Sequence, residues 1–485
     1  MIYFILIIIS IITILRILIT PREKHNKLNR RALFWSLALL LIFCYLYLAS
    51  KNIKQIQFTQ SYDWLKHLGL YFYWGNITFV LDTLSLLFIG LSILLTPICV
   101  LVSWNTVKNF KKEFLLAIFS ILILLILVFA IMDLLGFYIL FETILIPMFL
   151  IIGIWGSREE KVRAAYYFFF YTLIGSLLML LSIFKIYALT GTTHYYALLH
   201  LEIPKNNQYW LFLGFFSSLA VKIPMFPCHI WLPQAHVEAP IAGSVLLAGI
   251  LLKLGGYGLI RFSFPLFPIA SEIFSPCLVV ISIIAIVYGA FTTCRQSDIK
   301  RLIAYSSISH MGLVTVSLFT HSLEGYIASV IMMLAHGLVS SGLFMISFTL
   351  YNRFHTRIIK YFKGLVISTP LLSSLTFILI LGNISFPGTL NFIAEFSSII
   401  AATRYSIFVG VGVCIGIFLG TVYSLSIYNR IYFGTLSNFT YYVRDLSALE
   451  YHSFIPLIGL TLTLGIIPNF ILPWFLNTLI FQISL

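Results

Sequence analysis

Charged residues are scarce in this chain. Only 9% of its 485 residues are Asp, Glu, Lys or Arg, whereas 60% are hydrophobic. An ordinary soluble domain is about 25% charged, so this composition excludes a soluble protein. Because one membrane crossing takes about 20 apolar residues, the sequence predicts membrane spans joined by short loops along almost its whole length.

The sequence also lacks the motifs that hold redox or nucleotide cofactors. Its six cysteines are scattered and form no C-x-x-C pair, so the spacing supports no disulfide framework, zinc site or iron–sulfur cluster. Neither a G-x-G-x-x-G nor a G-x-x-x-x-G-K-[ST] motif occurs, and these are the common devices for binding nucleotides. We therefore expect no cofactor and no metal ion in this chain.

The apolar segments that fill the sequence predict an all-α polytopic membrane protein with about fourteen transmembrane helices. The first segment follows no basic region and precedes no small-residue cleavage site, so we read it as a retained helix rather than a signal peptide. The predicted spans are 1–20, 31–49, 78–103, 113–132, 134–156, 165–190, 209–226, 239–260, 272–294, 301–320, 324–350, 364–403 (broken), 405–432 and 452–475.

Positive charge is unevenly distributed among the predicted loops. The net charge is +14, and the chain has 30 Lys and Arg residues. Counted from the N-terminus, the odd loops hold 20 of them, the even loops 6, with Arg261 among these, and the predicted spans 4. This bias follows the positive-inside rule, so it predicts that the odd loops face the cytoplasm or matrix and that both termini face the other side. The basic charge reflects membrane topology, and we expect no nucleic-acid partner.

Two of the predicted spans are interrupted by proline. The first break follows Lys222 at Pro224, and the second lies in 382–388, where Pro387 is followed by Gly388. Pro224 and Pro387 are 163 residues apart, or about five spans. Broken helices at corresponding positions of two halves are typical of inverted-repeat transporters, with the ion site beside each break.

This spacing predicts two inverted five-helix repeats, each with one broken helix. An odd number of spans reverses the direction of the chain, so the second repeat would be inverted relative to the first. The predicted divisions are three N-terminal helices (1–112), the first repeat with helices 4–8 (113–260), the second repeat with helices 9–13 (261–432) and a region with helix 14 (433–485).

Titratable residues lie within the predicted spans around these breaks. Burying a charged side chain at the centre of a membrane helix costs about 2.5–3.5 kcal/mol on insertion scales, so such residues are usually functional. Burial can bring the pKa of a carboxylate or lysine toward neutrality, and histidine titrates there already. We therefore predict a proton relay formed by Glu142, Lys222, Lys253, His310, His336 and Glu395.

Each candidate also has a structural interpretation. A single histidine in a membrane helix often makes only a helix–helix hydrogen bond, and Lys185 could extend to the bilayer edge or serve inside the relay. The acids near span ends, expected at the interface, are Asp82, Asp133 and Glu324. Three prolines favour a structured loop over a metal site for His229, His236 and Glu238.

The sequence around the first break resembles the signature of the membrane subunits of proton-translocating NADH dehydrogenases. The matching segment, 221–258, includes Lys-Ile-Pro-Met-Phe-Pro-Cys-His-Ile-Trp-Leu-Pro-Gln-Ala-His. Segments 298–312 and 336–344 support the resemblance, which extends from about Asp133 to Arg430. Within this family, Phe-Glu-Thr-Ile-Leu-Ile-Pro-Met-Phe around Glu142 and an acid in the second broken helix most resemble the subunit 4 group of respiratory complex I.

The resemblance implies a proton-translocating membrane-arm subunit of NADH:ubiquinone oxidoreductase, driven by quinone reduction elsewhere in the complex. It implies that Glu142, Lys222, Lys253 and Glu395 form the central proton axis. It also implies that FMN, iron–sulfur clusters and ubiquinone belong to partner subunits, and that antiporter-like subunits 2 and 5 are neighbours in the lipid membrane. A residue composition that suits an AT-rich organelle genome favours the mitochondrial inner membrane over a bacterial plasma membrane.

Two other functions remain open from the sequence. A subunit of a multisubunit Na⁺/H⁺ antiporter carries nearly the same motifs and would exchange cations for protons without NADH. A structural membrane subunit could retain the buried charges without using them, although charge that has no function is costly to insert.

Overall fold

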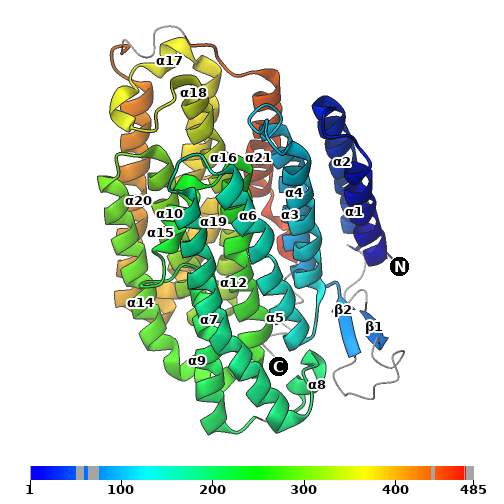
Figure 1. The fold of residues 1–485 in the computed structure, drawn as a ribbon. Helices are drawn as coiled ribbons and strands as arrows, with labels where there is room; N and C mark the ends of the chain where they lie inside the picture. Colours follow the sequence, from blue (N-terminus) through cyan, green and yellow to red (C-terminus); the bar gives the residue numbers. More distant parts are fainter. Residues whose placement is uncertain are drawn as a thin grey trace. The chain divides into compact units, whose positions relative to one another are not determined.

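The computed structural model describes residues 2–50, 59–63, 76–201, 203–437, 443–473 and 476. The end of the predicted span 452–475 therefore lies outside the described residues. The described chain is mainly helical, which confirms the predicted all-α class. The structure adds one feature that the sequence analysis did not predict, an antiparallel hairpin of β1 (Thr59–Asp63) and β2 (Asn76–Val80) (Figure 1).

Eleven helices among the described residues are long and apolar enough to cross a membrane. They are α2 (His25–Ser50), α3 (Thr83–Val102), α4 (Lys111–Ala130), the pair α5 (Leu134–Thr143) and α6 (Leu145–Trp155), α7 (Lys161–Thr190), the run from α11 to α13 (Ile241–Leu266), α14 (Pro268–Arg295), α15 (Ile299–Phe319), α16 (Leu323–Phe354), α20 (Ile407–Tyr432) and α21 (Ala448–Ile466).

The three remaining predicted spans coincide with helices that are shorter or less apolar, so the count of fourteen stays a prediction. These helices are α1 (Ile2–Leu18), α9 (Lys205–Lys222) and the pair α18 (Pro370–Asn383) and α19 (Leu390–Tyr405). Short helices complete the described chain: α8 (Tyr195–Leu199), α10 (Trp231–Glu238), α17 (Leu365–Ser368), and 3₁₀ turns at Ile359–Tyr361 and Pro468–Phe470.

Both predicted helix breaks are present. Helix α9 ends at Lys222, two residues before Pro224, and α18 ends at Asn383, before the segment that contains Pro387. Proline has no backbone N–H and its ring clashes with the preceding turn, so neither helix continues through its proline. Each break leaves backbone polar groups without helical partners close to a titratable or amide side chain.

The chain packs as two compact units. Unit 1 comprises 1–222, 257–273 and 473–485, and unit 2 comprises 223–256 and 274–472. This division follows packing rather than internal symmetry, so the predicted repeats stay a prediction. In unit 1, α7 lies against α9 and α6, and α1 packs on α2 and α4 (Figure 1).

Helix α16 is the centre of unit 2. It contacts α15, α18, α19 and α21, and its apolar stretch is entirely buried. Small residues make this possible because they allow neighbouring backbones to approach closely. A Cβ at Gly342 would lie 2.8 Å from Leu379, and one at Gly256 would meet Met333 at 2.4 Å. A larger residue at either position would require the Leu379 or the Met333 side chain to move.

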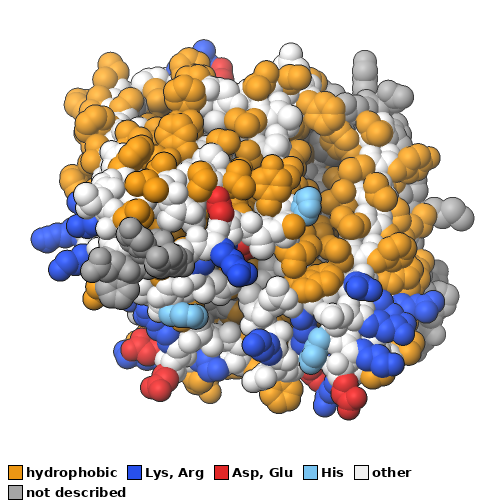
Figure 2. Space-filling model, turned by 90° about the horizontal axis from the view of Figure 1, so that it is seen from above, with side chains coloured by type: hydrophobic (Ala, Val, Ile, Leu, Met, Phe, Trp, Pro, Cys, Tyr) orange, Lys and Arg blue, Asp and Glu red, His pale blue; other side chains and the backbone are white. Residues whose placement is uncertain are grey.

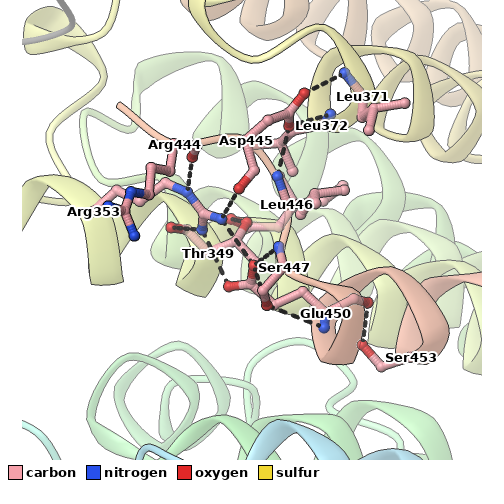
Figure 3. A network of polar contacts seen from close by, with 11 residues as sticks. Thr349, Arg353, Leu371, Leu372, Arg444, Asp445, Leu446, Ser447, Glu450 and Ser453 are labelled. Carbon is pink, nitrogen blue, oxygen red and sulfur yellow. Dashed lines mark hydrogen bonds and ion pairs between the residues drawn. The ribbon is translucent and has the colours of Figure 1, made fainter. Parts of the chain in front are cut away.

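A polar network joins the ends of three helices in unit 2 (Figure 3). Arg353, in the last turn of α16, donates to both carboxylate oxygens of Glu450, at 2.8 and 3.1 Å. It also donates to the carbonyl oxygens of Arg444 and Asp445. The Asp445 carboxylate in turn accepts from the backbone N–H groups of Leu371 and Leu372, at the start of α18. Ser447 and Glu450 form a capping box at the start of α21.

We expect Asp445→Ala to lower the free energy of unfolding by about 1 kcal/mol, the typical cost of losing a helix N-cap. Two backbone donors of α18 would lose their acceptor, whereas Asp445→Asn keeps an oxygen and should cost less. The thermal unfolding midpoint of the assembled protein measures the difference. Equal midpoints for the Ala variant and the unsubstituted protein would show that the network does not stabilise α18.

Figure 2 views the molecule from the end at which α17 lies in Figure 1. Lys and Arg side chains are more frequent than Asp and Glu on this face, beside many hydrophobic side chains. The segment that leads into α17 contains Arg357, Lys360 and Lys363, and it is one of the predicted odd loops. The side of the membrane that this face occupies stays a prediction.

Candidate functional site

The six predicted relay residues fall into two groups, one in each unit. Unit 1 contains Glu142 and Lys222, and unit 2 contains the other four.

In unit 1, Lys222 is the last residue of α9 and only 3% exposed. Its ammonium nitrogen lies 4.2 Å above the centre of the Phe141 ring. A cation in this position is attracted by the negative face of the ring, by about 2 kcal/mol or more when water is excluded. The aromatic contact was not foreseen from the sequence, although Phe141 directly precedes Glu142. The Phe141 ring therefore stabilises the buried charge of Lys222 but cannot accept its proton.

Glu142 lies near Lys222 without a direct hydrogen bond to it. Both of its carboxylate oxygens are shielded from solvent, and neither has a hydrogen-bond partner in the described chain. Its charge nevertheless interacts with that of Lys222, and Ser176 of α7 is close by. The two side chains are thus separated rather than joined in a direct ion pair. A buried carboxylate that makes no ion pair at contact distance is costly, so this arrangement favours proton exchange over a fixed ion pair.

In unit 2, Lys253 is completely buried in α12 (Leu252–Gly258), between two π-helical turns at Leu247–Leu251 and Leu259–Ser263. Its ammonium group donates to the carbonyl oxygen of Ala248 and lies 2.9 Å from Nδ1 of His336. A π turn widens the helix and loosens its hydrogen bonds, and such turns are frequent at functional sites. Here the loosened turn supplies the carbonyl group that binds the lysine.

From His336, the series of neighbouring titratable side chains continues to Glu395. The rings of His336 and His310 lie 5.7 Å apart between centroids. His310 Nδ1 is 3.5 Å from Glu395 Oε1, and the two side chains are 5% and 6% exposed. Four helices thus bring Lys253, His336, His310 and Glu395 into one buried row. The prediction that these residues are close together therefore agrees with the geometry, while their role in proton transfer stays a prediction.

Asn383 is a site residue that is not among the six predicted from the sequence. It is the last residue of α18 before the second break, and its Oδ1 lies 3.1 Å from His310 Nε2. Its amide nitrogen donates to Ser424 of α20 at 3.3 Å. The signal was available, because an amide directly before a helix break is placed where backbone and side chains converge. The break therefore positions a hydrogen-bonding group on the relay.

Arg261 differs most from its expected place. It was expected in an even loop, but it is buried within the helical run from α11 to α13 and forms an ion pair with Asp82 in unit 1. Asp133 accepts hydrogen bonds from Gly136 N–H and the Thr193 hydroxyl, so it caps α5. Burial raises the pKa of Asp133. Neither the Arg261–Asp82 ion pair nor Asp133 is part of the predicted relay.

The remaining candidates have simpler surroundings. Lys185 is exposed on α7, and Glu324 forms an exposed ion pair with Arg404. His229 packs beside Phe226 and Tyr288, and His236 stacks on Phe344 with centroids 4.5 Å apart. No group of three His, Cys, Asp or Glu residues in the described chain could hold a metal ion.

Comparison with known proteins places these residues in a family. A family model described as "NADH:quinone oxidoreductase/Mrp antiporter, TM" matches residues 131–420, a region that contains all six candidates. The chain belongs to this family. The matched region of this oxidoreductase/antiporter family begins just before α5 and ends within α20, so it includes both helix breaks.

Relatives in this family match nearly the whole chain. The chain is 52% identical over 479 residues to "NADH-ubiquinone oxidoreductase chain 4" of Metridium senile, covering 99% of this chain and 97% of the relative. It is 44% identical to the protein of the same name from Marchantia polymorpha, covering 96% and 93%. A chain in the solved structure of respiratory complex I from Thermus thermophilus with bound NADH is 28% identical, with a TM-score of 0.89 and coverage of 100% and 99%.

Proposed function

We propose that this chain is a proton-translocating membrane subunit of NADH:ubiquinone oxidoreductase. The chain itself has no redox site, and electron transfer from NADH through FMN and iron–sulfur clusters to ubiquinone takes place in partner subunits. The relatives named chain 4 support this assignment. The geometric observation that carries it is the buried row in unit 2, because a lysine hydrogen-bonded to a histidine can exchange a proton with it directly.

The contacts in unit 2 support stepwise proton transfer. Lys253 passes a proton to Nδ1 of a neutral His336, which leaves a neutral amine and an imidazolium. The His336 and His310 rings are 5.7 Å apart between centroids, so the next transfer passes through a bridging water to Nδ1 of His310, which then delivers the proton to the Glu395 carboxylate, 3.5 Å away. Asn383 holds the His310 ring through its other nitrogen and so fixes which atom faces the carboxylate. Each step leaves one site neutral and ready to be reprotonated.

Unit 1 is suited to control proton release. The positive charge on Lys222 is stabilised by the ring of Phe141 and by the nearby charge of Glu142. When Glu142 takes up a proton, the second of these attractions is lost and Lys222 releases its own proton more easily. The test is Glu142→Gln, which imposes that neutral state permanently.

We expect Glu142→Gln to slow proton transport about tenfold, since an interaction of about 1.4 kcal/mol between charges corresponds to a factor of ten. The measurement is NADH-driven proton uptake into vesicles containing the assembled complex, followed with a pH-sensitive dye. Glu159→Gln is the matched control, because Glu159 is an exposed acid in the loop before α7. Normal transport in a fully assembled Glu142→Gln complex would remove this residue from the mechanism.

The activity of the isolated complex that contains this chain distinguishes the proposed function from that of a Na⁺/H⁺ antiporter. A particle with NADH-dependent quinone reduction fits the proposed function, and an all-membrane particle that exchanges sodium for protons fits the alternative. As part of the same proposal, the neighbours are antiporter-like subunits 2 and 5, and the location is the mitochondrial inner membrane with both termini on the intermembrane-space side.

A further inference from the structure

Three segments that are distant in the sequence meet at one end of unit 1, beside the start of α5 (Figure 1). Each lies in or beside a predicted even loop, and they are β2, residues 131–134 and residues 193–199, which include α8. Met132 N–H donates to the carbonyl oxygen of Thr78 at 2.9 Å, and Leu134 N–H donates to that of Thr193 at 3.1 Å. These backbone hydrogen bonds fix the place at which α5 begins.

Helix α5 carries Glu142 as the ninth of its ten residues. Its N-terminus is held by Asp133, whose carboxylate accepts from Gly136 N–H at 2.7 Å and from the Thr193 hydroxyl at 2.6 Å. A helix of ten residues is about 15 Å long, and a tilt or shift at its start also displaces its end. The position of Glu142 within unit 1 therefore depends on the hydrogen bonds of Asp133.

His194 lies next to this cap and joins α8 to β2. Its Nδ1 accepts a hydrogen bond from Ala197 N–H at 3.4 Å, which caps α8, and its Nε2 lies 3.0 Å from the Thr78 hydroxyl oxygen. An imidazole nitrogen that accepts a hydrogen bond carries no proton, so the ring is neutral, with its proton on Nε2, which donates to Thr78. The hydrogen bonds thus assign both the charge and the tautomer of His194.

A second proton on His194 is incompatible with this arrangement. The proton would bind Nδ1, which would then face the Ala197 N–H as one donor against another, and the cap of α8 would be lost. The positive charge of the ring would also be attracted to the Asp133 carboxylate, which holds the start of α5. Protonation of His194 therefore loosens the start of α5 through the residue that caps it.

The surroundings of His194 favour the neutral ring at neutral pH. Burial lowers the pKa of the imidazole, and the charge of Asp133 opposes this effect. Among the described side chains, the other titratable group that faces His194 is Tyr196, with ring centroids 5.9 Å apart, and burial raises the pKa of Tyr196 to about 12. Because the folded state favours the neutral imidazole, acid below about pH 6.5 destabilises this arrangement.

We propose that His194 is a positioning residue for Glu142 that responds to the pH on the even-loop side of the membrane. The proposal rests on the proposed function, in which that side receives the translocated protons. When this compartment is neutral, the His194 ring caps α8 and leaves the Asp133 carboxylate to α5. When the compartment becomes acidic, the imidazolium releases α8 and attracts Asp133, so Glu142 is held less firmly and transport slows. The subunit thus senses the proton gradient that it builds.

The test compares His194→Asn with the unsubstituted chain in vesicles of the assembled complex. Asparagine is among the best residues at a helix N-cap, and it does not titrate. The vesicles are loaded with buffer between about pH 7.5 and pH 5.5, on either side of the ordinary histidine pKa. In the proposed orientation, NADH added outside drives the complexes whose even loops face the lumen. A potential-sensitive dye reports the initial rate of charge transfer.

We expect the rate of the unsubstituted complex to fall about fivefold as the lumen is acidified, the factor that corresponds to one lost helix N-cap. His194→Asn should keep the fast rate at every pH, and His194→Ala, which removes the cap, should be slow at every pH. His200→Asn is the matched control, because His200 is an exposed histidine at the other end of α8. This variant should respond to luminal pH as the unsubstituted complex does.

Hydrogen–deuterium exchange shows whether the effect passes through α5. After correction for the intrinsic exchange rate, the amides of α8 and of the first turn of α5 should lose protection in acid in the unsubstituted complex but keep it in His194→Asn. Unchanged protection of α5 in acid would contradict the proposal, because Glu142 would then stay in place. A His194→Asn complex that still slows in acid, or a His194→Ala complex that is fast at every pH, would also overturn it.

Failure of this proposal and failure of the proposed function give different results. If Glu142→Gln slows transport while His194→Asn and the unsubstituted complex respond equally to luminal pH, the role of His194 is overturned and the function stands. If Glu142→Gln transports protons normally, the function proposed for unit 1 fails, and His194 has no relay residue to position. Each variant is compared only after the complex is shown to assemble with normal NADH oxidation by an artificial acceptor, which bypasses the membrane arm.

Discussion

Lys253→Met is expected to lower NADH-driven proton transport about 100-fold, the lower range of what a positioned acid or base contributes. Lys253 is fully buried and is the residue of unit 2 that hydrogen-bonds directly to His336. Methionine has nearly the same length and no charge to bury, so the fold should be retained and its thermal stability equal or higher. The measurement is dye-reported proton uptake in vesicles of the assembled complex.

Two variants show whether the loss comes from proton exchange or from charge. Lys253→Arg keeps the positive charge, but arginine does not release its proton in proteins, so we expect no recovery of transport. Lys185→Met removes a lysine from an exposed position on α7 and should leave transport unchanged. Recovery in the Arg variant would mean that Lys253 acts only as a fixed charge and would contradict its role as a relay group.

Much of this site could be predicted from the sequence because charge and proline are costly in a membrane. Lys222, Lys253 and Glu395 stand out against apolar surroundings, and the two prolines mark the ends of α9 and α18. The cost of burial is a local property, so it can be read one residue at a time. The pairing of Lys253 with His336, 83 positions apart, depends on how α12 and α16 pack, and periodicity does not contain that information.

The structure also shows features that no sequence signal predicted. The π turns on either side of Lys253 arise from packing within an otherwise ordinary apolar helix. The hairpin of β1 and β2 lies mostly between the second and third predicted spans, and its end, 78–80, replaces the predicted start of the third span. Arg261 was misplaced because a charge near a span end is usually solvated, whereas here an acid from a distant helix neutralises it.

Each unit combines a helix break with a titratable group and a side chain that cannot accept its proton. In unit 1, the Phe141 ring stabilises Lys222 without accepting a proton. In unit 2, the Asn383 amide binds His310 and likewise has no proton to exchange at neutral pH. A neutral partner holds the relay group in place while leaving its proton free to move. The breaks supply this arrangement, because an uninterrupted helix would direct these side chains along regular faces.

The largest effect on stability is expected for Arg261→Met. Arg261 and Asp82 are 3% and 5% exposed at the side chain and form a buried ion pair. Removing one partner of such a pair leaves a buried, uncompensated charge and costs about 3–5 kcal/mol. Asp82 also precedes the first turn of α3 in a capping box with Ser85, so the cost should be concentrated there. Hydrogen–deuterium exchange of the α3 amides in the assembled complex measures the local opening free energy.

A double variant distinguishes charge from packing. Asn replaces Asp at a helix N-cap with little loss, so Asp82→Asn combined with Arg261→Met removes both charges and keeps the cap. We expect this double variant to recover most of the protection that Arg261→Met alone loses. Arg404→Met, which breaks the exposed pair with Glu324, should change stability by less than about 1 kcal/mol. If the double variant were as unstable as Arg261→Met, the packing of the arginine side chain, rather than its charge, would hold η3 (Leu259–Ser263) against α3.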